Sequence, residues 1–161
     1  MKIHVITTGG TIDKVYFDAN SEFQVGRPMI EELLQEAHVT AEVTIEPVLA
    51  KDSLELTDAD RQLIRERVLA CPVERILITH GTDTMAETGR ALKGVVGKTI
   101  VLTGSMQPAR FRSTDAVFNV GFALGAVQSL APGVYLAING QVFDPERVRK
   151  NRARQRFEEA G

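Results

Sequence analysis

The stretch Thr7-Thr8-Gly9-Gly10-Thr11-Ile12 follows the first apolar run of the chain, Ile3 to Ile6. A short apolar run of this kind predicts a buried strand, and the two glycines let the chain bend sharply behind it. A second loop, His80-Gly81-Thr82-Asp83-Thr84, follows another apolar run, Arg75 to Thr79. Because open α/β sheets bind their ligands at loops that follow strands, the two loops predict one shared crevice.

The composition excludes several classes of protein. The 161 residues suffice for one domain with its own core, and a net charge of −2 gives no general attraction to nucleic acid or anionic membranes. Cys71 is the only cysteine, so neither an intrachain disulfide nor a zinc site built on thiolates can form. The N-terminal residues 1–6 lack the longer apolar stretch that is typical of a signal peptide, and no segment approaches the ~20 apolar residues of a membrane span. We therefore expect a cytoplasmic protein without nucleic acid, membrane, metal or cofactor among its partners.

Short apolar runs alternate with longer amphipathic segments along the whole chain. This alternation favours an α/β fold, with an open, mostly parallel, doubly wound sheet of flavodoxin-like or Rossmann-like form and helices on both faces. We expect residues 1–161 to form a single domain. The expected strands are 3–6, 43–49, 75–79, 99–102 and 133–138, with a return strand at 141–143 after the Asn139-Gly140 turn. The expected helices begin at Pro28, after the N-cap Thr57, near Met85 and near Ala116.

The predicted helix 116–130 is apolar around most of its circumference, and it contains Gly121 and Gly125. A helix of this kind must be covered on more than one side. The cover could be the long connections of its own domain or a second subunit, and the sequence leaves both open.

Small hydroxyl and amide residues follow the predicted strands. Thr11 is a candidate nucleophile, which needs a neighbouring base or hydrogen-bond chain to react near neutral pH. Gly9 and Gly10 would leave backbone N–H groups free for a developing oxyanion. The same glycines could form only a tight turn, or a phosphate cradle, although no P-loop Lys-Ser/Thr follows.

Thr82 and Asp83 require a partner if they are to move a proton. A carboxylate can hold a lysine close to a hydroxyl, and Lys51, Lys93 and Lys150 are the candidates. His80 lacks a companion Ser or Cys at a known spacing, which favours a structural role. Asp83 and Asp115 could equally be N-caps of the helices that follow them.

Together these motifs resemble the bacterial L-asparaginase/glutaminase family. The resemblance rests on Thr8-Gly9-Gly10-Thr11-Ile12, on His80-Gly81-Thr82-Asp83-Thr84-Met85, and on Thr103-Gly104-Ser105-Met106 with Asp115 and Phe118-Asn119. It extends from residue 1 to about residue 150.

The resemblance implies a role for each matching residue. Thr11 would attack the side-chain amide carbon of L-asparagine, forming an acyl-enzyme and releasing ammonia. Thr82, Asp83 and Lys150 would form a supporting triad, with Asp83 also binding the α-amino group. Gly10, Gly81 and Ser105 would help to bind the substrate. Family members assemble as homo-oligomers, so the resemblance also implies a homodimer or a homotetramer.

Three features depart from the family pattern. The family's loop tyrosine aligns with Phe23, which cannot relay a proton, and we expect Tyr16 to supply the phenol instead. The family's substrate-binding Ser-Gln pair aligns with Ala50-Lys51, so we expect Lys51, Asp52 and Ser53 to contact the substrate. Family members are about twice this length and have a C-terminal domain that lends an acidic residue to a neighbouring subunit. The resemblance does not include that domain, so we expect either a naturally short enzyme or a shortened chain.

Other interpretations remain open. The fold could belong to a non-catalytic sensor or remnant that binds an amino acid, or to a module that passes ammonia to a partner. Six of the residues 147–156 are basic, which fits a nucleic-acid arm or, more simply, the solvated end of an amphipathic helix. Residues 13–26 form a connection long enough to be a lid over the site, or a static packed loop.

Overall fold

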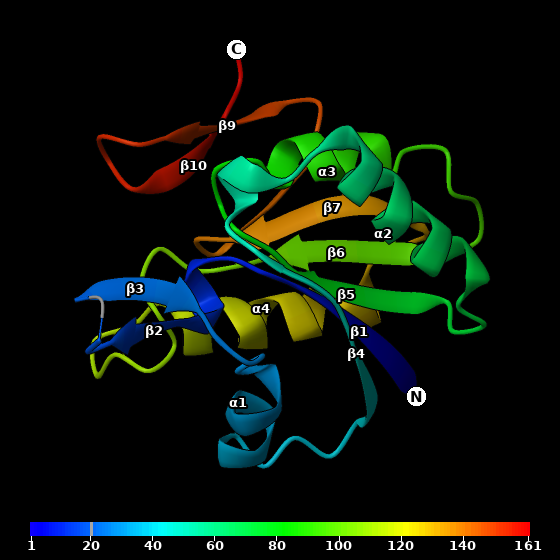
Figure 1. Cartoon of the computed structure of the whole chain (residues 1–161). Helices are drawn as coiled ribbons and strands as arrows, with labels where there is room; N and C mark the ends of the chain where they lie inside the picture. Colours follow the sequence, from blue (N-terminus) through cyan, green and yellow to red (C-terminus); the bar gives the residue numbers. More distant parts are fainter. Residues whose placement is uncertain (20) are drawn as a thin grey trace.

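A six-stranded sheet forms the centre of the protein in the computed structural model, which describes residues 1–19 and 21–161 (Figure 1). The strand order is β4-β1-β5-β6-β7-β8, in which neighbours are parallel except for β7 and β8. The chain therefore reverses its direction of travel across the sheet at β1 and β5, as in flavodoxin-like folds. The bounds are β1 (Lys2–Gly9), β4 (Glu42–Lys51), β5 (Arg75–Thr79), β6 (Thr99–Thr103), β7 (Gly133–Ile138) and β8 (Gln141–Phe143).

The central strands are apolar because both of their faces are covered. In β5, Leu77 belongs to one core, while Ile76 and Ile78 belong to the other. The same division occurs in β6, where Val101 faces the first core and Leu102 the second. Alternating side chains point to opposite faces of a strand, so continuous apolar runs are what a sheet covered on both sides requires.

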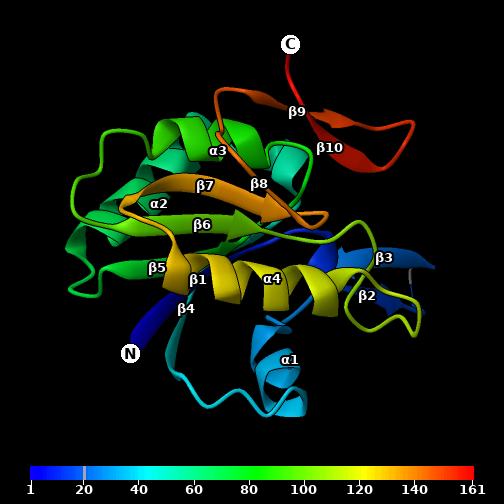
Figure 2. The ribbon, with the colours of Figure 1, turned by 180° about the vertical axis from the view of Figure 1, so that it is seen from behind.

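Helices cover both faces of the sheet, as the sequence predicts. The first core includes side chains from α1 and α4, and the second includes side chains from α2 and α3. Figures 1 and 2 show α2 and α3 on one side of the sheet and α4 on the other. The bounds are α1 (Ile30–Glu36), α2 (Asp58–Ala70), α3 (Met85–Ala91) and α4 (Ala116–Ser129), with two short 3-10 helices, η1 (Thr11–Asp13) and η2 (Ser53–Glu55).

The helix starts differ in how well local sequence determines them. Thr57 caps α2 as predicted, since its hydroxyl accepts a hydrogen bond from the Asp60 N–H and the Asp60 carboxylate accepts one from the Thr57 N–H. Helix α1 begins at Ile30, two residues after the predicted start at Pro28. The N–H of Met29 instead donates to the buried carboxylate of Asp13, a tertiary contact that no local pattern reveals.

Two β-hairpins lie beyond the carboxyl edge of the sheet (Figure 1). The first consists of β2 (Lys14–Phe17) and β3 (Glu22–Val25), within the predicted lid; residue 20 of that segment lies outside the described residues. The second consists of β9 (Val148–Asn151) and β10 (Arg156–Glu159). The interpretation of residues 147–156 as the end of a helix is therefore wrong. Val148 and Phe157 are buried in the second core, which fixes this segment as a hairpin.

Only one side of α4 is covered. Ala116, Val120 and Val127 are buried, but Val117 and Phe118 are more than half exposed. A Cβ added to Gly121 or Gly125 would meet no described atom within 4 Å. The connections of the described chain therefore do not cover this helix all round, and the expected homodimer or homotetramer stays a prediction that light scattering can test.

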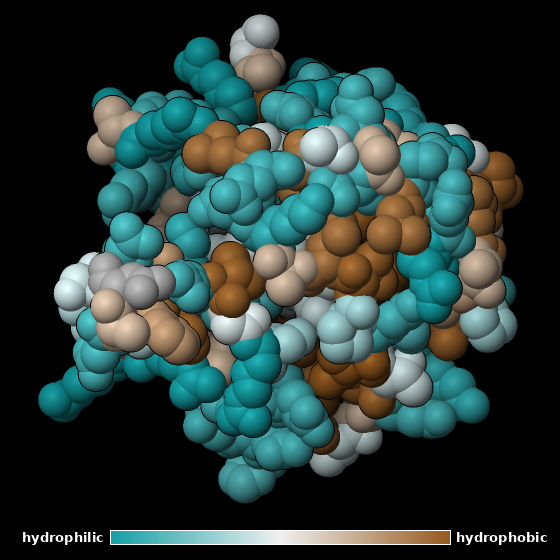
Figure 3. Space-filling view, in the orientation of Figure 1, coloured by the Kyte–Doolittle hydropathy of each residue, from teal (hydrophilic) through white to brown (hydrophobic). Residues whose placement is uncertain are grey.

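The surface on the side of α2 and α3 is largely polar. Figure 3 shows that the face bearing α2 and α3 is mainly hydrophilic, with apolar residues in separate patches. Among the described residues, no helix has the length and the apolar character needed to cross a membrane.

Candidate active site

The two hydroxyl loops meet at one cavity, as predicted. Strands β1 and β5 are parallel neighbours, with Thr7 paired with Thr79, so the loops that follow them leave the sheet side by side. Thr11 opens η1 directly behind β1, and Thr82 follows β5. Both residues line a cavity of about 260 Å³ at the carboxyl edge. Its lining consists of Thr11, Leu54, Thr82, Asp83, Met106, Lys150, Arg152 and Gln155.

The glycines allow the loops to pack backbone against backbone. Gly9 and Gly10 have φ angles of 96° and 88°, which side chains disfavour. A Cβ on Gly10 would lie 2.4 Å from the Gly81 nitrogen, and one on Gly81 would lie 2.5 Å from the Ser53 Cβ. Neither position has room for a side chain. The Gly10 N–H donates to the Lys51 carbonyl at 2.9 Å, so the prediction that it is free for an oxyanion is wrong.

Lys150 reaches the cavity from the β9–β10 hairpin. Its Nζ donates to Thr82 Oγ1 at 2.7 Å and to Asp83 Oδ1 at 2.9 Å. The lysine side chain is only 16% exposed. Of the three candidate lysines, this is the one that joins Thr82 and Asp83. Asp83 does not cap α3, because the N-cap position is Thr84 and that cap has no side-chain hydrogen bond.

Tyr16 lies on the outer hairpin rather than in the cavity wall. It stands opposite Phe23 across the β2–β3 pair, with ring centroids 5.4 Å apart, and it is 53% exposed. Phe23 in turn packs edge-on against Phe111. The role of Tyr16 as the proton-relaying phenol stays a prediction, which requires the hairpin to bring the hydroxyl to Thr11.

The residues from Lys51 to Ser53 are engaged with other groups. The Lys51 ammonium binds both carboxylate oxygens of Asp60, at 3.0 and 2.9 Å. Asp52 accepts from the Leu54 N–H at 3.0 Å and forms an ion pair with Lys14 at 2.9 Å. Ser53 is buried against Gly81. None of the three is among the residues that line the cavity, and their contact with substrate stays a prediction.

Ser105 and Asp115 shape the loop after β6. Ser105 is buried and its hydroxyl donates to the Gln107 carbonyl at 2.5 Å. Asp115 precedes α4 but makes no side-chain cap bond to it. Its carboxylate instead accepts from the N–H groups of Met106 and Gln107. Asp115 therefore holds the loop that places Met106 in the cavity wall, while direct contact between Ser105 and substrate stays a prediction.

His80 is a structural residue. It is fully buried, its Nδ1 lies 2.7 Å from the Gly81 carbonyl oxygen, and its Nε2 lies 2.7 Å from Thr88 Oγ1. Burial lowers its pKa from 6.5 to about 4, only partly opposed by the hydrogen bond to Gly81. The neutral ring therefore ties the Thr82 loop to α3.

Four residues of the cavity wall are absent from the sequence prediction: Leu54, Met106, Arg152 and Gln155. Met106 lies within a motif quoted for the resemblance, so its position offered a signal. Arg152 and Gln155 lie in the turn between β9 and β10, and only the pairing of these strands brings them to the site.

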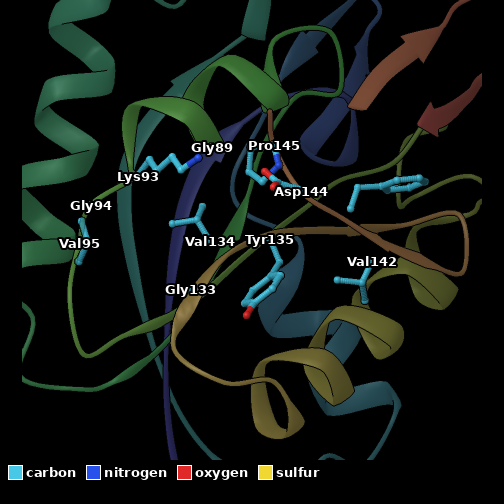
Figure 4. Close-up of a pocket in the computed structure, with 11 residues that line it drawn as sticks. Gly89, Lys93, Gly94, Val95, Gly133, Val134, Tyr135, Val142, Asp144 and Pro145 are labelled. Carbon is cyan, nitrogen blue, oxygen red and sulfur yellow. The ribbon is translucent and has the colours of Figure 1, made fainter. Parts of the chain in front are cut away.

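A second cavity, of about 390 Å³, lies between the end of α3 and strands β7 and β8 (Figure 4). Val134, Tyr135 and Val142 contribute to its wall. The Tyr135 hydroxyl donates to the Ala131 carbonyl at 3.1 Å. Lys93, at its rim, forms an ion pair with Glu146. Because none of the predicted catalytic residues lines it, chemistry is better sought at the Thr11 cavity.

The described residues contain no group of three or more His, Cys, Asp or Glu side chains arranged to hold a metal ion. The Thr11 cavity instead combines hydroxyls, one carboxylate and three cationic or amide side chains. Such a set can activate a hydroxyl nucleophile and bind a small polar molecule.

Comparisons with known proteins agree with this geometry. The L-asparaginase of Thermococcus kodakarensis is 32% identical over 162 residues, which cover 93% of this chain and 48% of that protein. A solved structure of the thermostable L-asparaginase from Thermococcus kodakarensis superposes with a TM-score of 0.85 at 29% identity, covering 99% of this chain and 51% of that one. L-asparaginase I from Vibrio cholerae gives the same TM-score at 30% identity, covering 99% and 54%.

The chain thus spans about half the length of the relatives it matches. The family model described as "Asparaginase, N-terminal" matches residues 2–158, almost the whole chain. The chain belongs to the asparaginase N-terminal family.

Proposed function

We propose that this protein is an amidohydrolase that converts L-asparagine to L-aspartate and ammonia. The observation that carries the proposal is the pair of hydrogen bonds from Lys150 to Thr82 and Asp83, in the same cavity as Thr11. Membership of the asparaginase family and similarity to proteins named L-asparaginase support the same reaction.

In the proposed mechanism, the Thr11 hydroxyl attacks the side-chain amide carbon of the substrate. The hydroxyl proton passes to the departing nitrogen, so that the C–N bond breaks and ammonia leaves. The acyl group then remains on Thr11 as an ester, which water hydrolyses to the carboxylate and the free hydroxyl. The chemistry balances without an oxidant, a reductant or a second substrate.

The second threonine and its lysine supply the proton path in this proposal. Lys150 donates to Thr82, and Asp83 holds the lysine by an ion pair at 2.9 Å. These contacts orient the Thr82 hydroxyl. Because its oxygen accepts from Lys150, its own proton stays available for donation to another group in the cavity. A positioned proton donor or acceptor accelerates such a step by about 10² to 10⁴-fold.

Ammonia release from L-asparagine and from L-glutamine tests the proposal directly. We expect release from asparagine by the wild-type protein and none by Thr11→Ala, with both proteins equally resistant to heat. Wild-type activity in Thr11→Ala would remove this residue as the nucleophile. If neither amide releases ammonia but asparagine still raises the melting temperature, the protein is a sensor of the same fold.

A further inference from the structure

The turn between β7 and β8 carries an asparagine in an uncommon backbone conformation. Asn139 has a φ angle of 54°, in the left-handed region that asparagine tolerates better than most residues do. The turn lies at the carboxyl edge of the sheet, where the β9–β10 hairpin also lies (Figure 2). Asn139 is not among the residues that line the Thr11 cavity, so any role in catalysis must be indirect.

The side chain of Asn139 holds the hairpin from outside the β9–β10 ladder. Its Oδ1 accepts a hydrogen bond from the Phe157 N–H at 2.9 Å. Phe157 is the residue of β10 that pairs with Lys150 of β9. Residues directly opposite each other in an antiparallel pair have side chains on the same face, with Cβ atoms about 4.5–5.5 Å apart. The bond to Asn139 therefore fixes the strand position that lies next to Lys150.

A second asparagine in turn holds Asn139. Asn119 of α4 is 1% exposed, and its Oδ1 accepts from the Asn139 N–H at 3.2 Å. Its Nδ2 donates to the Gly104 carbonyl at 2.9 Å and to the Asp115 carboxylate at 3.0 Å. Because the amide oxygen and the amide nitrogen are both in use, the buried side chain has one favourable orientation. This orientation fixes Asn139 relative to the loop after β6.

The two asparagines thus connect the loop after β6 to the hairpin that carries Lys150. Asp115 holds that loop by accepting from the N–H groups of Met106 and Gln107, and Met106 lines the cavity. One end of this series of hydrogen bonds therefore supports Met106 and the other end supports Lys150. Two walls of the cavity that come from distant parts of the chain are held in register in this way.

We propose that Asn139 is a positioning residue, which keeps Lys150 within hydrogen-bond distance of Thr82 by holding Phe157. This inference rests on the proposed function, in which Lys150 and Thr82 form the proton path. Burial of the Phe157 ring attaches the hairpin to the second core, but apolar contacts are not directional. A hydrogen bond is directional, and a misplacement of about 1 Å can cost about 10²-fold in rate.

Asn139→Gly removes the hydrogen-bond acceptor and leaves the turn unstrained, because glycine adopts positive φ angles readily. We expect kcat for asparagine to fall by about 10- to 100-fold, with KM close to that of the wild type, because Lys150 is misplaced rather than lost. Asn139→Asp should recover most of this loss, since aspartate tolerates the same φ angle and its carboxylate can accept from the Phe157 N–H. If Asn139→Asp loses as much kcat as Asn139→Gly, the inference is wrong.

Val68→Ala is the control for a general loss of stability. Val68 is fully buried in the second core, which also contains Phe157, but it belongs to α2 and its side chain cannot form hydrogen bonds. This variant should melt at a lower temperature than the wild type and retain wild-type kcat below its melting transition. A loss of kcat in Val68→Ala equal to that in Asn139→Gly would show that the effect is one of stability alone, contrary to the inference.

A double-mutant cycle with Lys150→Met shows whether Asn139 acts through the lysine. If it does, Asn139→Gly should cause no further loss of kcat in a protein that already lacks the ammonium group. The same fold-loss in both backgrounds would mean that Asn139 acts independently of Lys150, which would overturn the inference.

Structural measurements separate this inference from the proposed function. If the wild type releases no ammonia from either amide, the proposed function fails, but crystal structures of the wild type and Asn139→Gly still test the position of Lys150. A distance from Lys150 Nζ to Thr82 Oγ1 that is longer in the variant than the 2.7 Å of the wild type would support the inference, and an unchanged distance would refute it.

Hydrogen exchange in the wild type gives a test that needs no variant, and it therefore also covers the case in which Asn139→Gly does not fold. The Phe157 N–H should exchange slowly, because it is held by Asn139. Exchange as fast as that of a solvent-exposed amide would refute the inference.

Discussion

The two hairpins at the carboxyl edge differ in how they are attached to the protein. The β9–β10 hairpin buries Phe157 to 5% exposure, and the Phe157 N–H donates to the Asn139 side chain at 2.9 Å. The β2–β3 hairpin leaves Tyr16 and Phe23 about half exposed. Its polar contact to the body of the protein is at its base, where Lys14 meets Asp52.

This difference suits two kinds of catalytic task. A lysine that must stay within hydrogen-bond distance of Thr82 needs an immobile support, which the β9–β10 hairpin gives by burying its own aromatic side chain. A group that acts only when substrate is present can lie on a less firmly attached segment. The comparison therefore predicts larger consequences for changes in the C-terminal hairpin than in the N-terminal one.

The largest effect is expected from Lys150→Met. Removing the ammonium breaks both hydrogen bonds to Thr82 and Asp83, so kcat for asparagine should fall by about 10² to 10⁴-fold. Steady-state ammonia release provides the measurement. Lys93→Met is the matched control, since Lys93 belongs to the other cavity, and it should retain wild-type kcat. Comparable losses in the two variants would mean that Lys150 has no special role.

Phe157→Ala and Phe23→Ala compare the attachment of the two hairpins directly. Truncating the buried Phe157 should lower the free energy of unfolding by about 3–5 kcal/mol. Truncating the half-exposed Phe23 should lower it by about 1 kcal/mol or less. Urea denaturation of both variants measures the difference. Equal losses would show that the hairpins are held with similar strength.

Asp13→Asn tests how the buried carboxyl at the base of the N-terminal hairpin makes the stability of the protein depend on pH. Burial raises the pKa of Asp13 from 3.8 to about 7, with partial opposition from the Met29 N–H. The folded state therefore binds the proton more tightly than the unfolded state, and stability falls as pH rises from about 4 to about 7. Asparagine cannot ionise, so the free energy of unfolding of the variant should not decline in this way. Between pH 5 and pH 8 it should rise by roughly 1–3 kcal/mol relative to that of the wild type. The free energies of unfolding of both proteins, measured across this range, should diverge; parallel curves would contradict the prediction.

Tyr16→Phe should have the smallest effect, the loss of a large fraction of kcat with unchanged stability. Only the hydroxyl is removed, and the ring contact with Phe23 is retained. Ammonia release by Tyr16→Phe and by Phe23→Ala, under the same conditions, identifies the contributing side chain. A larger loss in Phe23→Ala would show that Tyr16 is not the proton-relaying residue.

Local patterns were sufficient for the main elements. The strands, the four helices and the cap at Thr57 follow from apolar periodicity and from hydrogen bonds between near neighbours. The hairpins were missed because each of their strands has only four residues, and their pairing depends on contacts elsewhere. Phe157, for example, is placed by a core whose other members come from distant parts of the chain.

The sequence by itself determined the alternating α/β plan and the family resemblance, and it predicted that the Thr11 and Thr82 loops share one crevice. The pairing of β1 with β5 in the folded protein made the loops neighbours. The sequence could not choose by chemistry among Lys51, Lys93 and Lys150, since each is a lysine near a loop. In the folded protein, Lys51 binds Asp60, Lys93 pairs with Glu146, and Lys150 binds both Thr82 and Asp83. The tertiary structure also brought Arg152 onto the same carboxylate. The reason is physical: Lys150 and Thr82 are 68 residues apart, so their hydrogen bond exists only once the sheet and the β9–β10 hairpin have formed.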